Sequence, residues 1–415
     1  MTILHLTTLW DSGGAADYTR NIHNNMLADG YRSYVAVAGT KLVTPDGKEI
    51  SIQRTEIPLW EKIKRDIHEK FIERRPPTID YKYIGHNLKE RYCEFNVKDL
   101  LRAMPENPDV VIVHWVSYYA NAKYVRDLQR LTGAKVYYIM IDDAILSGGC
   151  HYPWDCEGYQ HGCKNCKMTN SRILKEFIRW NYLHKKQYLV DEKNVIASTE
   201  FDVARLKKSP LWKGCSVHKL IEVIDDELFY PANNKSEIKK KFDIPEGKKV
   251  VFFGCSFFNE IRKGMSVLID ALMTINRDDI VYLVAGANTL PNLPNNIIYI
   301  GKVDIPTLAK AYQAADIFVC PSLEDSGPQM INMAIMSGVP TVAFEMGVAL
   351  DIVITGKTGY RAKWNDSDDL ANGINYLLDM PDAQLEEMRK GCRTMAMNTF
   401  SKKCQQEFFN KLLYN

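Results

Sequence analysis

Apolar and polar positions follow two alternating patterns along most of the chain. Short continuous apolar runs, typical of strands buried on both faces, precede stretches in which apolar residues recur every three or four positions, as in amphipathic helices. In the first half this predicts strands at 2–9, 34–38, 110–114, 135–141 and 195–198, and helices at 15–27 and 121–131. The alternation indicates a parallel sheet with helices on both faces.

A second alternation begins after residue 234. It predicts strands at 249–253, 280–285, 297–300, 317–320 and 340–344, and helices at 264–275, 305–315, 329–337, 370–378 and 402–414. We therefore predict an α/β protein with two doubly wound, Rossmann-like domains, 1–222 and 223–395, facing each other across a cleft. The last helix, within 396–415, is predicted to pack back on the first domain. Ligands bind outside the carboxyl ends of strands in such sheets, so the chemistry is expected in the cleft.

A separate amphipathic helix is predicted at 60–75. Leu59, Ile63, Ile67 and Phe71 recur at every fourth position, with basic residues around them. Residues 59–75 could therefore touch a membrane or a lipid-linked acceptor. Acidic residues dilute the positive charge, so a helix packed on its own domain is the favoured interpretation.

Composition narrows the classes of function. Apolar residues make up 46% and charged residues 25% of the 415 residues, as in an ordinary globular protein, which excludes long disorder. A formal net charge of +2 argues against a nucleic-acid binder that neutralises many phosphates. No run of 18 apolar residues occurs, and the amino terminus is typical of a strand instead of a signal peptide. We predict a cytoplasmic protein whose ten cysteines are thiols or metal ligands.

The strongest local signal for chemistry lies between residues 321 and 340. Here a predicted strand leads into a helix that starts near Pro328, and the backbone N–H groups from Gly327 to Met330 would form an anion site. A diphosphate held there would leave sugar hydroxyls within reach of Glu324 and Asn332. The alternative is an ordinary turn with a solvated glutamate.

Three further positions follow predicted strands. Arg262 and Lys263 lie on a loop where two cations would offset the charge of a departing diphosphate. Gly13 and Gly14 would let the backbone approach a ligand closely, although the dinucleotide fingerprint is absent. His114 ends a buried strand at its carboxyl edge. The alternatives are a solvated pair of cations, a plain tight turn and a structural histidine.

Together these segments resemble a known family. The stretch from Glu324 to Asn332 resembles the E-x7-E motif of the GT-B nucleotide-sugar glycosyltransferases, family 4, and residues 319–322 and 337–342 resemble its flanks. Residues 109–114 resemble the strand whose last histidine lies near the donor sugar, 262–264 the donor-phosphate motif, and 223–231 the interdomain linker. The resemblance extends over nearly the whole chain. It differs at the second glutamate, which is Asn332 here, and in a donor-phosphate arginine, since Gly254 is followed by Cys255.

The resemblance implies a retaining transfer of a sugar from a UDP- or GDP-sugar to an acceptor hydroxyl. It implies a role in bacterial surface polysaccharide synthesis (capsule, lipopolysaccharide or exopolysaccharide), with a saccharide or lipid-linked saccharide as acceptor. The enzyme would be cytoplasmic or peripheral on the inner face of the plasma membrane, without an obligatory catalytic metal. The expected catalytic residues are His114, Arg262, Lys263 and Glu324, and the expected donor-binding residues are Gly13, Gly14, Gly327, Pro328, Gln329 and Asn332. A nucleotide-sugar 2-epimerase of the same fold and a non-catalytic, zinc-organised sugar-binding protein are the alternatives.

A cysteine-rich insert at 148–168 stands apart from both alternations. Cys150, Cys156, Cys163 and Cys166 fall within 17 residues, a spacing that resembles a closed structural zinc site. His151 and His161 are substitute ligands, and disulfides, reduced thiols or an iron–sulfur cluster are alternatives. The polysaccharide branch of the family carries a similar Gly-Gly-Cys-His-Tyr stretch. Asp142, just before the insert, matches the aspartate of that branch and is a candidate on the acceptor side. No carboxylate pair typical of a glycosidase stands out, which favours transfer over hydrolysis.

Overall fold

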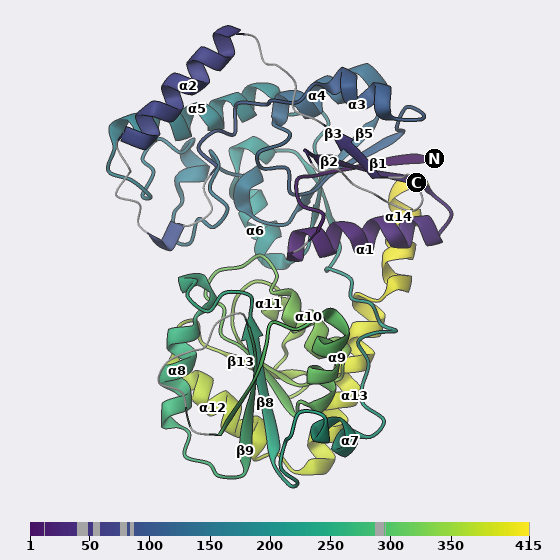
Figure 1. Cartoon of the computed structure of the whole chain (residues 1–415), viewed down its shortest axis with the longest axis vertical. Helices are drawn as coiled ribbons and strands as arrows, with labels where there is room; N and C mark the ends of the chain where they lie inside the picture. Colours follow the sequence, from purple (N-terminus) through teal and green to yellow (C-terminus); the bar gives the residue numbers. More distant parts are fainter. Residues whose placement is uncertain are drawn as a thin grey trace. The chain divides into compact units, whose positions relative to one another are not determined.

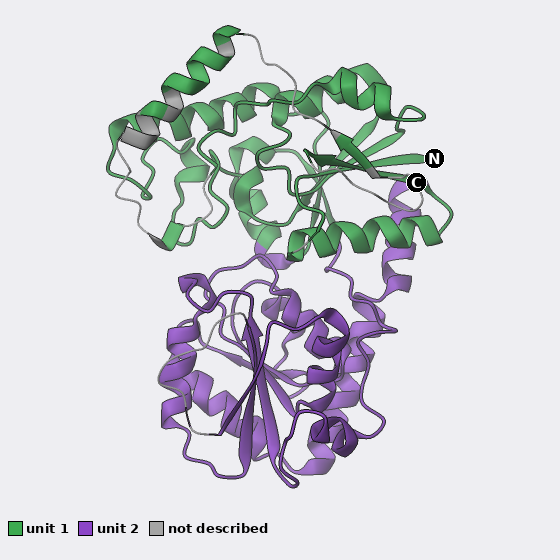
Figure 2. Cartoon of the chain, in the orientation of Figure 1, with its two compact units in different colours: residues 1–198, 202–219 green, residues 199–201, 220–415 purple. Residues whose placement is uncertain are grey.

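The computed structural model describes residues 1–11, 13–39, 49–52, 59–74, 81–83, 87–286, 294 and 296–414. It divides into two compact units (Figures 1 and 2). The N-terminal unit comprises residues 1–198 and 202–219, and the C-terminal unit comprises 199–201 and 220–415. Ser12 of the predicted glycine loop and Arg75 of the predicted surface helix lie outside the described residues.

The described part of the N-terminal unit contains a seven-stranded parallel sheet with the order β3-β2-β1-β4-β5-β6-β7. Its strands are β1 (Thr2–Thr7), β2 (Arg32–Ala38), β3 (Glu49–Ile52), β4 (Val110–Val113), β5 (Lys135–Met140), β6 (Asn194–Ala197) and β7 (Ser216–Lys219). Its helices are α1 (Gly14–Ala28), α2 (Leu59–Arg74), α3 (Val97–Ala103), α4 (Ala122–Thr132), α5 (Arg172–Tyr188) and most of α6 (Glu200–Lys208).

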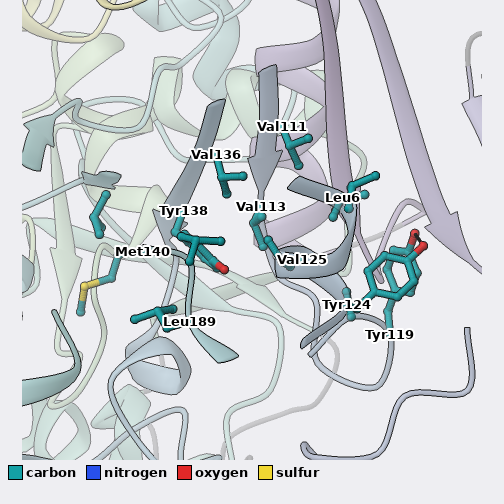
Figure 3. Packing of buried hydrophobic residues seen from close by; sticks show 14 of the residues in the cluster. Leu6, Val111, Val113, Tyr119, Tyr124, Val125, Val136, Tyr138, Met140 and Leu189 are labelled. Carbon is teal, nitrogen blue, oxygen red and sulfur yellow. Dashed lines mark hydrogen bonds between the residues drawn. The ribbon is translucent and has the colours of Figure 1, made fainter. Parts of the chain in front are cut away.

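One core of this unit lies between the sheet and its helices (Figure 3). Alternate side chains of β4 and β5, such as Val111, Val113 and Tyr138, point to the same side of the sheet, as the two-residue period of a strand requires. They pack with Tyr124 and Val125, which α4 supplies at the start of its apolar stripe. The core thus fixes the carboxyl ends of β4 and β5, where His114 and Asp142 follow.

The C-terminal unit contains, within its described residues, a six-stranded parallel sheet with the order β10-β9-β8-β11-β12-β13. Its strands are β8 (Lys249–Cys255), β9 (Ile280–Gly286), β10 (Ile297–Gly301), β11 (Ile317–Cys320), β12 (Thr341–Phe344) and β13 (Gly359–Ala362). Its helices are α7 (Lys235–Lys240), α8 (Met265–Thr274), α9 (Ile305–Ala314), α10 (Gln329–Met336), α11 (Ala349–Ile352), α12 (Ser367–Leu378), α13 (Asp382–Thr399) and α14 (Lys402–Tyr414).

In each sheet, two neighbouring strands mark the point from which the chain adds further strands toward opposite edges. In the N-terminal unit the chain runs outward in one direction from β1 and in the other from β4, and in the C-terminal unit it does so from β8 and β11. Open α/β sheets bind ligands beside the carboxyl ends of such neighbouring strands. The predicted loops follow these four strands, so each unit by itself presents a candidate site.

The predicted α/β class, and each strand and helix of the two alternations, are confirmed with shifts of a few residues at their ends. The pattern did not indicate β3, β7 and β13, nor the long helices α5 and α13. The predicted packing of the last helix on the first domain stays a prediction. Among the described residues, the structure contains no helix that could cross a bilayer.

Candidate functional site

Two loops of the C-terminal unit are held together at the carboxyl ends of β8 and β11. The N–H of Leu323 donates to the carbonyl oxygen of Arg262 at 2.7 Å, so the loop after β11 is fixed against the loop after β8. Gly264 adopts a φ of 65°, and a Cβ at this position would lie 1.8 Å from the carbonyl oxygen of Pro321. Only glycine permits this approach, which brings Arg262 and Lys263 beside the segment that contains Glu324.

The cations of the first loop bind a carboxylate of the second. Arg262 Nη1 lies 2.8 Å and Lys263 Nζ lies 2.7 Å from the same oxygen, Oδ2 of Asp325. Arg262 also pairs with Glu260 at 2.8 Å. The two cations that the sequence analysis assigned to a diphosphate therefore lie close together. In this structure the Asp325 carboxylate binds both of them.

Burial and charge act in opposite directions on Asp325. Burial of the carboxyl group disfavours its ionised form, but the Lys263 and Arg262 cations outweigh that effect and hold the pKa of Asp325 below its ordinary value. Asp325 is consequently an anion at neutral pH. A nucleoside diphosphate would have to share these cations with Asp325 or displace it.

The start of α10 carries the other predicted donor residues. Glu324 and Asn332 are buried, and Gly327 and Pro328 lead directly into the helix at Gln329. Asn332 Nδ2 donates to the backbone oxygen of Glu222 at 2.8 Å, and Gln329 Nε2 donates to Glu222 Oε1 at the same distance.

The amide of Asn332 is therefore partly used inside the unit. Its Oδ1 is buried and has no hydrogen-bond partner among the described residues, so one acceptor stays available for a ribose hydroxyl. The predicted residues Arg262, Lys263, Glu324, Gly327, Pro328, Gln329 and Asn332 thus come together in one unit, while their donor-binding roles stay predictions.

In the N-terminal unit the glycine loop opens α1. Gly13 has a φ of 99° and precedes the first helical residue. Apart from the chain neighbours, no atom of the described residues lies within 4 Å of a Cβ built on Gly13 or Gly14. The loop follows β1, one of the two strands at the reversal of the sheet. This geometry agrees with a close approach of ligand to backbone and leaves the predicted role untested.

His114 belongs to a buried histidine network instead of standing alone. Its Nε2 lies 2.9 Å from His5 Nδ1, and Ser33 Oγ links His5 Nε2 at 3.0 Å to His23 Nδ1 at 2.7 Å. Burial, and then the charge of His23, lower the pKa of His114 to about 3, so its imidazole is neutral at physiological pH. His114 can donate or accept a hydrogen bond there, but it cannot supply a positive charge.

Asp142 lies at the end of β5 and holds a second histidine. Asp142 Oδ2 contacts His151 Nδ1 at 2.6 Å and Trp115 Nε1 at 2.9 Å, while Oδ1 accepts from the N–H of Ala144 at 2.9 Å. On the far side of the ring, His151 Nε2 lies 3.2 Å from Ser117 Oγ. Asp142, Trp115, Ser117 and His114 line one pocket of the N-terminal unit.

The four clustered cysteines also line a common pocket, a second and smaller one. All four have free thiols, and no group of three or more His, Cys, Asp or Glu residues in the described parts of the chain is arranged to hold a metal ion. Burial raises the pKa of Cys163 to about 12 and that of Cys166 to about 11, which favours protonated thiols. The zinc prediction is therefore not supported, and His151 binds Asp142 in place of a metal.

Sequence reasoning missed three groups in these sites. Asp325 follows Glu324 directly, and an acidic pair beside a loop with two cations was a usable signal. Glu222 lies just before the predicted linker, and no local pattern indicates that its carbonyl meets Asn332. Ser117 and His151 are separated by 34 residues, so only the fold could bring them together.

Comparison with known proteins agrees with these features. Residues 234–396 match the family model "Glycosyl transferases group 1". The chain is 32% identical to a phosphatidyl-myo-inositol mannosyltransferase of Mycobacterium leprae over 143 residues, which cover 32% of this chain and 37% of that protein. It is 24% identical to the lipopolysaccharide core biosynthesis mannosyltransferase LpsB of Rhizobium meliloti over 222 residues, which cover 47% of this chain and 61% of that protein. In each case the chain spans less than two thirds of the relative.

Solved structures resemble the whole chain in fold. A sucrose-phosphate synthase from Thermosynechococcus elongatus has a TM-score of 0.69 at 18% identity, with 100% of this chain and 98% of that chain covered. HepE of Anabaena in complex with UDP and glucose has a TM-score of 0.67 at 14% identity, with 100% and 99% covered. Most of the C-terminal unit thus matches a glycosyltransferase family model, and the chain has the GT-B type of fold, with two Rossmann-like α/β units.

Proposed function

We propose that the protein transfers a sugar from a nucleoside diphosphate donor to an acceptor hydroxyl. The observation that carries the proposal is the cluster of Arg262 and Lys263 with the start of α10, beside the strand reversal of a unit that matches a glycosyltransferase family model. Two cations and a helix N-terminus suit a diphosphate leaving group, whose negative charge grows as the bond to the sugar breaks.

The C-terminal unit would bind the donor. Arg262 and Lys263 would stabilise the diphosphate without an obligatory metal, Glu324 would accept hydrogen bonds from sugar hydroxyls, and Asn332 Oδ1 would bind the ribose. The donor is a UDP- or GDP-sugar. A structural neighbour in complex with UDP and glucose supports the first nucleotide, and a relative described as a GDP-mannose-dependent mannosyltransferase supports the second.

The N-terminal unit would bind the acceptor, a saccharide or lipid-linked saccharide, with Asp142 on the acceptor side. His114 and the Gly13–Gly14 loop of this unit would keep their expected roles in catalysis and donor binding. One relative is described as a galactosyltransferase that acts on a diphosphoundecaprenol-linked sugar, which supports a lipid-linked acceptor. We infer retention of configuration and a role in bacterial surface polysaccharide synthesis, in the cytoplasm.

Nucleotide binding is the first test. A thermal-shift screen with UDP, GDP, uridine and guanosine should identify one diphosphate that raises the melting temperature, because a ligand that binds only the folded state stabilises it. The matching nucleoside should give a much smaller shift, since it lacks the groups that Arg262 and Lys263 bind.

Turnover is the second test. The corresponding nucleotide sugar should release nucleotide slowly in water and faster with an acceptor, and Glu324→Ala should lower the release at least about 100-fold, as expected for a group that acts in the transition state. Formation of the C2-epimerised sugar without an acceptor would indicate the 2-epimerase. Nucleotide binding without release from any common UDP- or GDP-sugar would contradict transfer and favour a binding protein.

Peripheral membrane contact is a further proposal for α2. Leu59, Trp60 and Ile67 are exposed by 73%, 65% and 51%, with the exposed Lys62 and Lys64 between them, a pattern that suits an anionic bilayer surface. Flotation with vesicles containing phosphatidylglycerol should recover the wild-type chain, and Trp60→Ser should reduce the recovery. Equal recovery of both would contradict this contact.

A further inference from the structure

In the N-terminal unit a serine, a histidine and an aspartate are linked by two successive hydrogen-bond contacts. Ser117 Oγ lies 3.2 Å from His151 Nε2, and His151 Nδ1 lies 2.6 Å from Asp142 Oδ2. We propose that these residues form a second reactive centre, in which His151 activates the Ser117 hydroxyl as a nucleophile toward small carboxylic esters. This centre shares Asp142 with the proposed acceptor side, but its chemistry requires no nucleotide sugar.

The hydrogen bonds around Asp142 fix the orientation of the histidine. Oδ1 accepts from the N–H of Ala144 at 2.9 Å, and Oδ2 accepts from Trp115 Nε1 at 2.9 Å and faces His151 Nδ1. Trp115 Nε1 also lies 3.2 Å from His151 Nδ1, but the carboxylate is closer, at 2.6 Å, and favours a proton on Nδ1. The lone pair of Nε2 is then directed at the serine. The same division of roles defines serine nucleophiles on unrelated folds.

The serine is more exposed than the histidine and the aspartate behind it. Ser117 is partly exposed, whereas His151 is 4% and Asp142 is 6% exposed. A reagent can therefore reach the hydroxyl while its base is shielded from water. Ser33 provides a contrast, because it also contacts two histidines but is fully buried.

The charges that face His151 favour acceptance of a proton. Burial acts to lower the pKa of His151, but the Asp142 and Glu90 carboxylates outweigh it and raise the pKa above its ordinary value, with Lys185 of α5 opposing them. Lys185 pairs with Glu90 and also donates to the carbonyl oxygen of Ser147 at 2.8 Å, so much of its charge is compensated nearby. The balance suits a base that must hold a proton for part of a reaction cycle.

The pocket beside Ser117 limits the acyl group. Trp115, Tyr118 and Tyr119 contribute aromatic walls, and the unfilled space is about 60 Å³. A small acyl group fits this space, and the aromatic walls suit an ester carried on a sugar ring.

The reaction balances with water as the second substrate. Ser117 Oγ attacks the carbonyl carbon while its proton moves to His151 Nε2. The carbon–oxygen bond to the alcohol then breaks, and the alcohol leaves with that proton. Water attacks the acyl-serine with the same help from His151, and it releases the carboxylic acid and the free hydroxyl.

Labelling with a fluorophosphonate–biotin probe on the full chain tests the proposal. The wild-type protein should become labelled on Ser117, located by peptide mass spectrometry, and should hydrolyse p-nitrophenyl acetate. Ser117→Ala should lose both signals, and His151→Gln should lower both at least about 100-fold, since a positioned base contributes that much. Ser216→Ala, an exposed serine of the same unit, is the matched control and should leave both unchanged.

Two further variants separate chemistry from folding. Asp142 acts through His151, so Asp142→Asn should slow labelling at an unchanged melting temperature and Asp142→Glu should restore part of the rate. Ser117→Cys should make residue 117 the fastest-alkylated thiol in iodoacetamide treatment. A folded wild-type protein without label at Ser117, or a label that persists in His151→Gln, would overturn the proposal, whatever the nucleotide assays show.

Discussion

The two units share a topology but treat charge at their strand reversals differently. In the C-terminal unit the loops after β8 and β11 gather two cations, and Asp325 neutralises part of their charge. In the N-terminal unit the residue that follows β4 is His114, which burial keeps neutral within a network of histidines. The first arrangement suits a charged ligand, and the second suits hydroxyl groups. Topology therefore determines where each site lies, while side-chain charge determines what each site can bind.

The close contact between the two loops of the C-terminal unit should tolerate no side chain at Gly264. A Cβ would lie 1.8 Å from the carbonyl oxygen of Pro321, at a φ of 65°. Overpacking and the left-handed backbone should together lower the free energy of unfolding by about 3 kcal/mol in Gly264→Ala. Gly13 in the N-terminal unit has a positive φ, but among the described residues other than its neighbours in the chain no atom lies within 4 Å of an added Cβ. About 1 kcal/mol is therefore expected for Gly13→Ala. Urea unfolding of both variants measures the difference, and equal losses would contradict the close contact.

Removal of both cations should abolish most diphosphate binding. Arg262→Ala combined with Lys263→Ala should weaken binding of the nucleoside diphosphate about 100-fold or more, since each hydrogen bond to a charged group contributes about 1.5–3 kcal/mol. Lys240→Ala with Lys241→Ala removes the same two charges from an exposed part of the unit and is the matched control. Isothermal titration calorimetry with the nucleoside diphosphate compares the dissociation constants of the two double variants. A similar loss of affinity in both double variants would mean that net charge alone, and not a specific site, accounts for the binding.

Acid should weaken the N-terminal unit before the C-terminal unit. The pKa of His114 is lowered to about 3 in the fold, against 6.5 in the unfolded chain, so between these values the unfolded chain binds a proton that the folded chain does not. The unit therefore has its full stability above pH 6.5 and loses about 1.4 kcal/mol per pH unit below it from this group. Asp316 of the C-terminal unit has its pKa lowered to about 2 and loses its contribution only below about pH 4.

Hydrogen exchange at pH 5 and 7, corrected for the intrinsic rate, should show faster opening of β1 and β4 at pH 5 and little change in β8 and β11. His114→Gln should remove part of this pH dependence. His161→Gln, which replaces an exposed histidine of the same unit, is the control and should keep it. Equal acceleration in both units at pH 5 would contradict the difference between them.

The periodic apolar pattern of the sequence predicted most of the strands and many of the helices. It did not predict features that depend on contacts between distant residues. Apolar runs indicated the central strands, because buried parallel strands have no polar positions to confuse the pattern. The edge strands β3, β7 and β13 were missed, since they are short and partly polar. Motif spacing located Arg262, Lys263 and Glu324. It could not show that Asp325 turns back onto both cations, because that contact depends on the packing of two loops about 60 residues apart.

Substitution of Asp325 should have the smallest effect on diphosphate affinity, but it is the most informative test of the cation cluster. It competes with a diphosphate for Arg262 and Lys263, so Asp325→Asn should free both cations and tighten nucleoside diphosphate binding about 10-fold, equal to one charge-assisted hydrogen bond of roughly 1.4 kcal/mol. Without ligand the variant should melt at a lower temperature, because two partly buried cations then repel each other, and pyrophosphate should restore the loss. Asp351→Asn, which removes an acidic charge elsewhere in the unit, should do neither. Weaker binding in Asp325→Asn would mean that the carboxylate orients the cations for the ligand instead of competing with it, and the site would then be organised by its own ion pair.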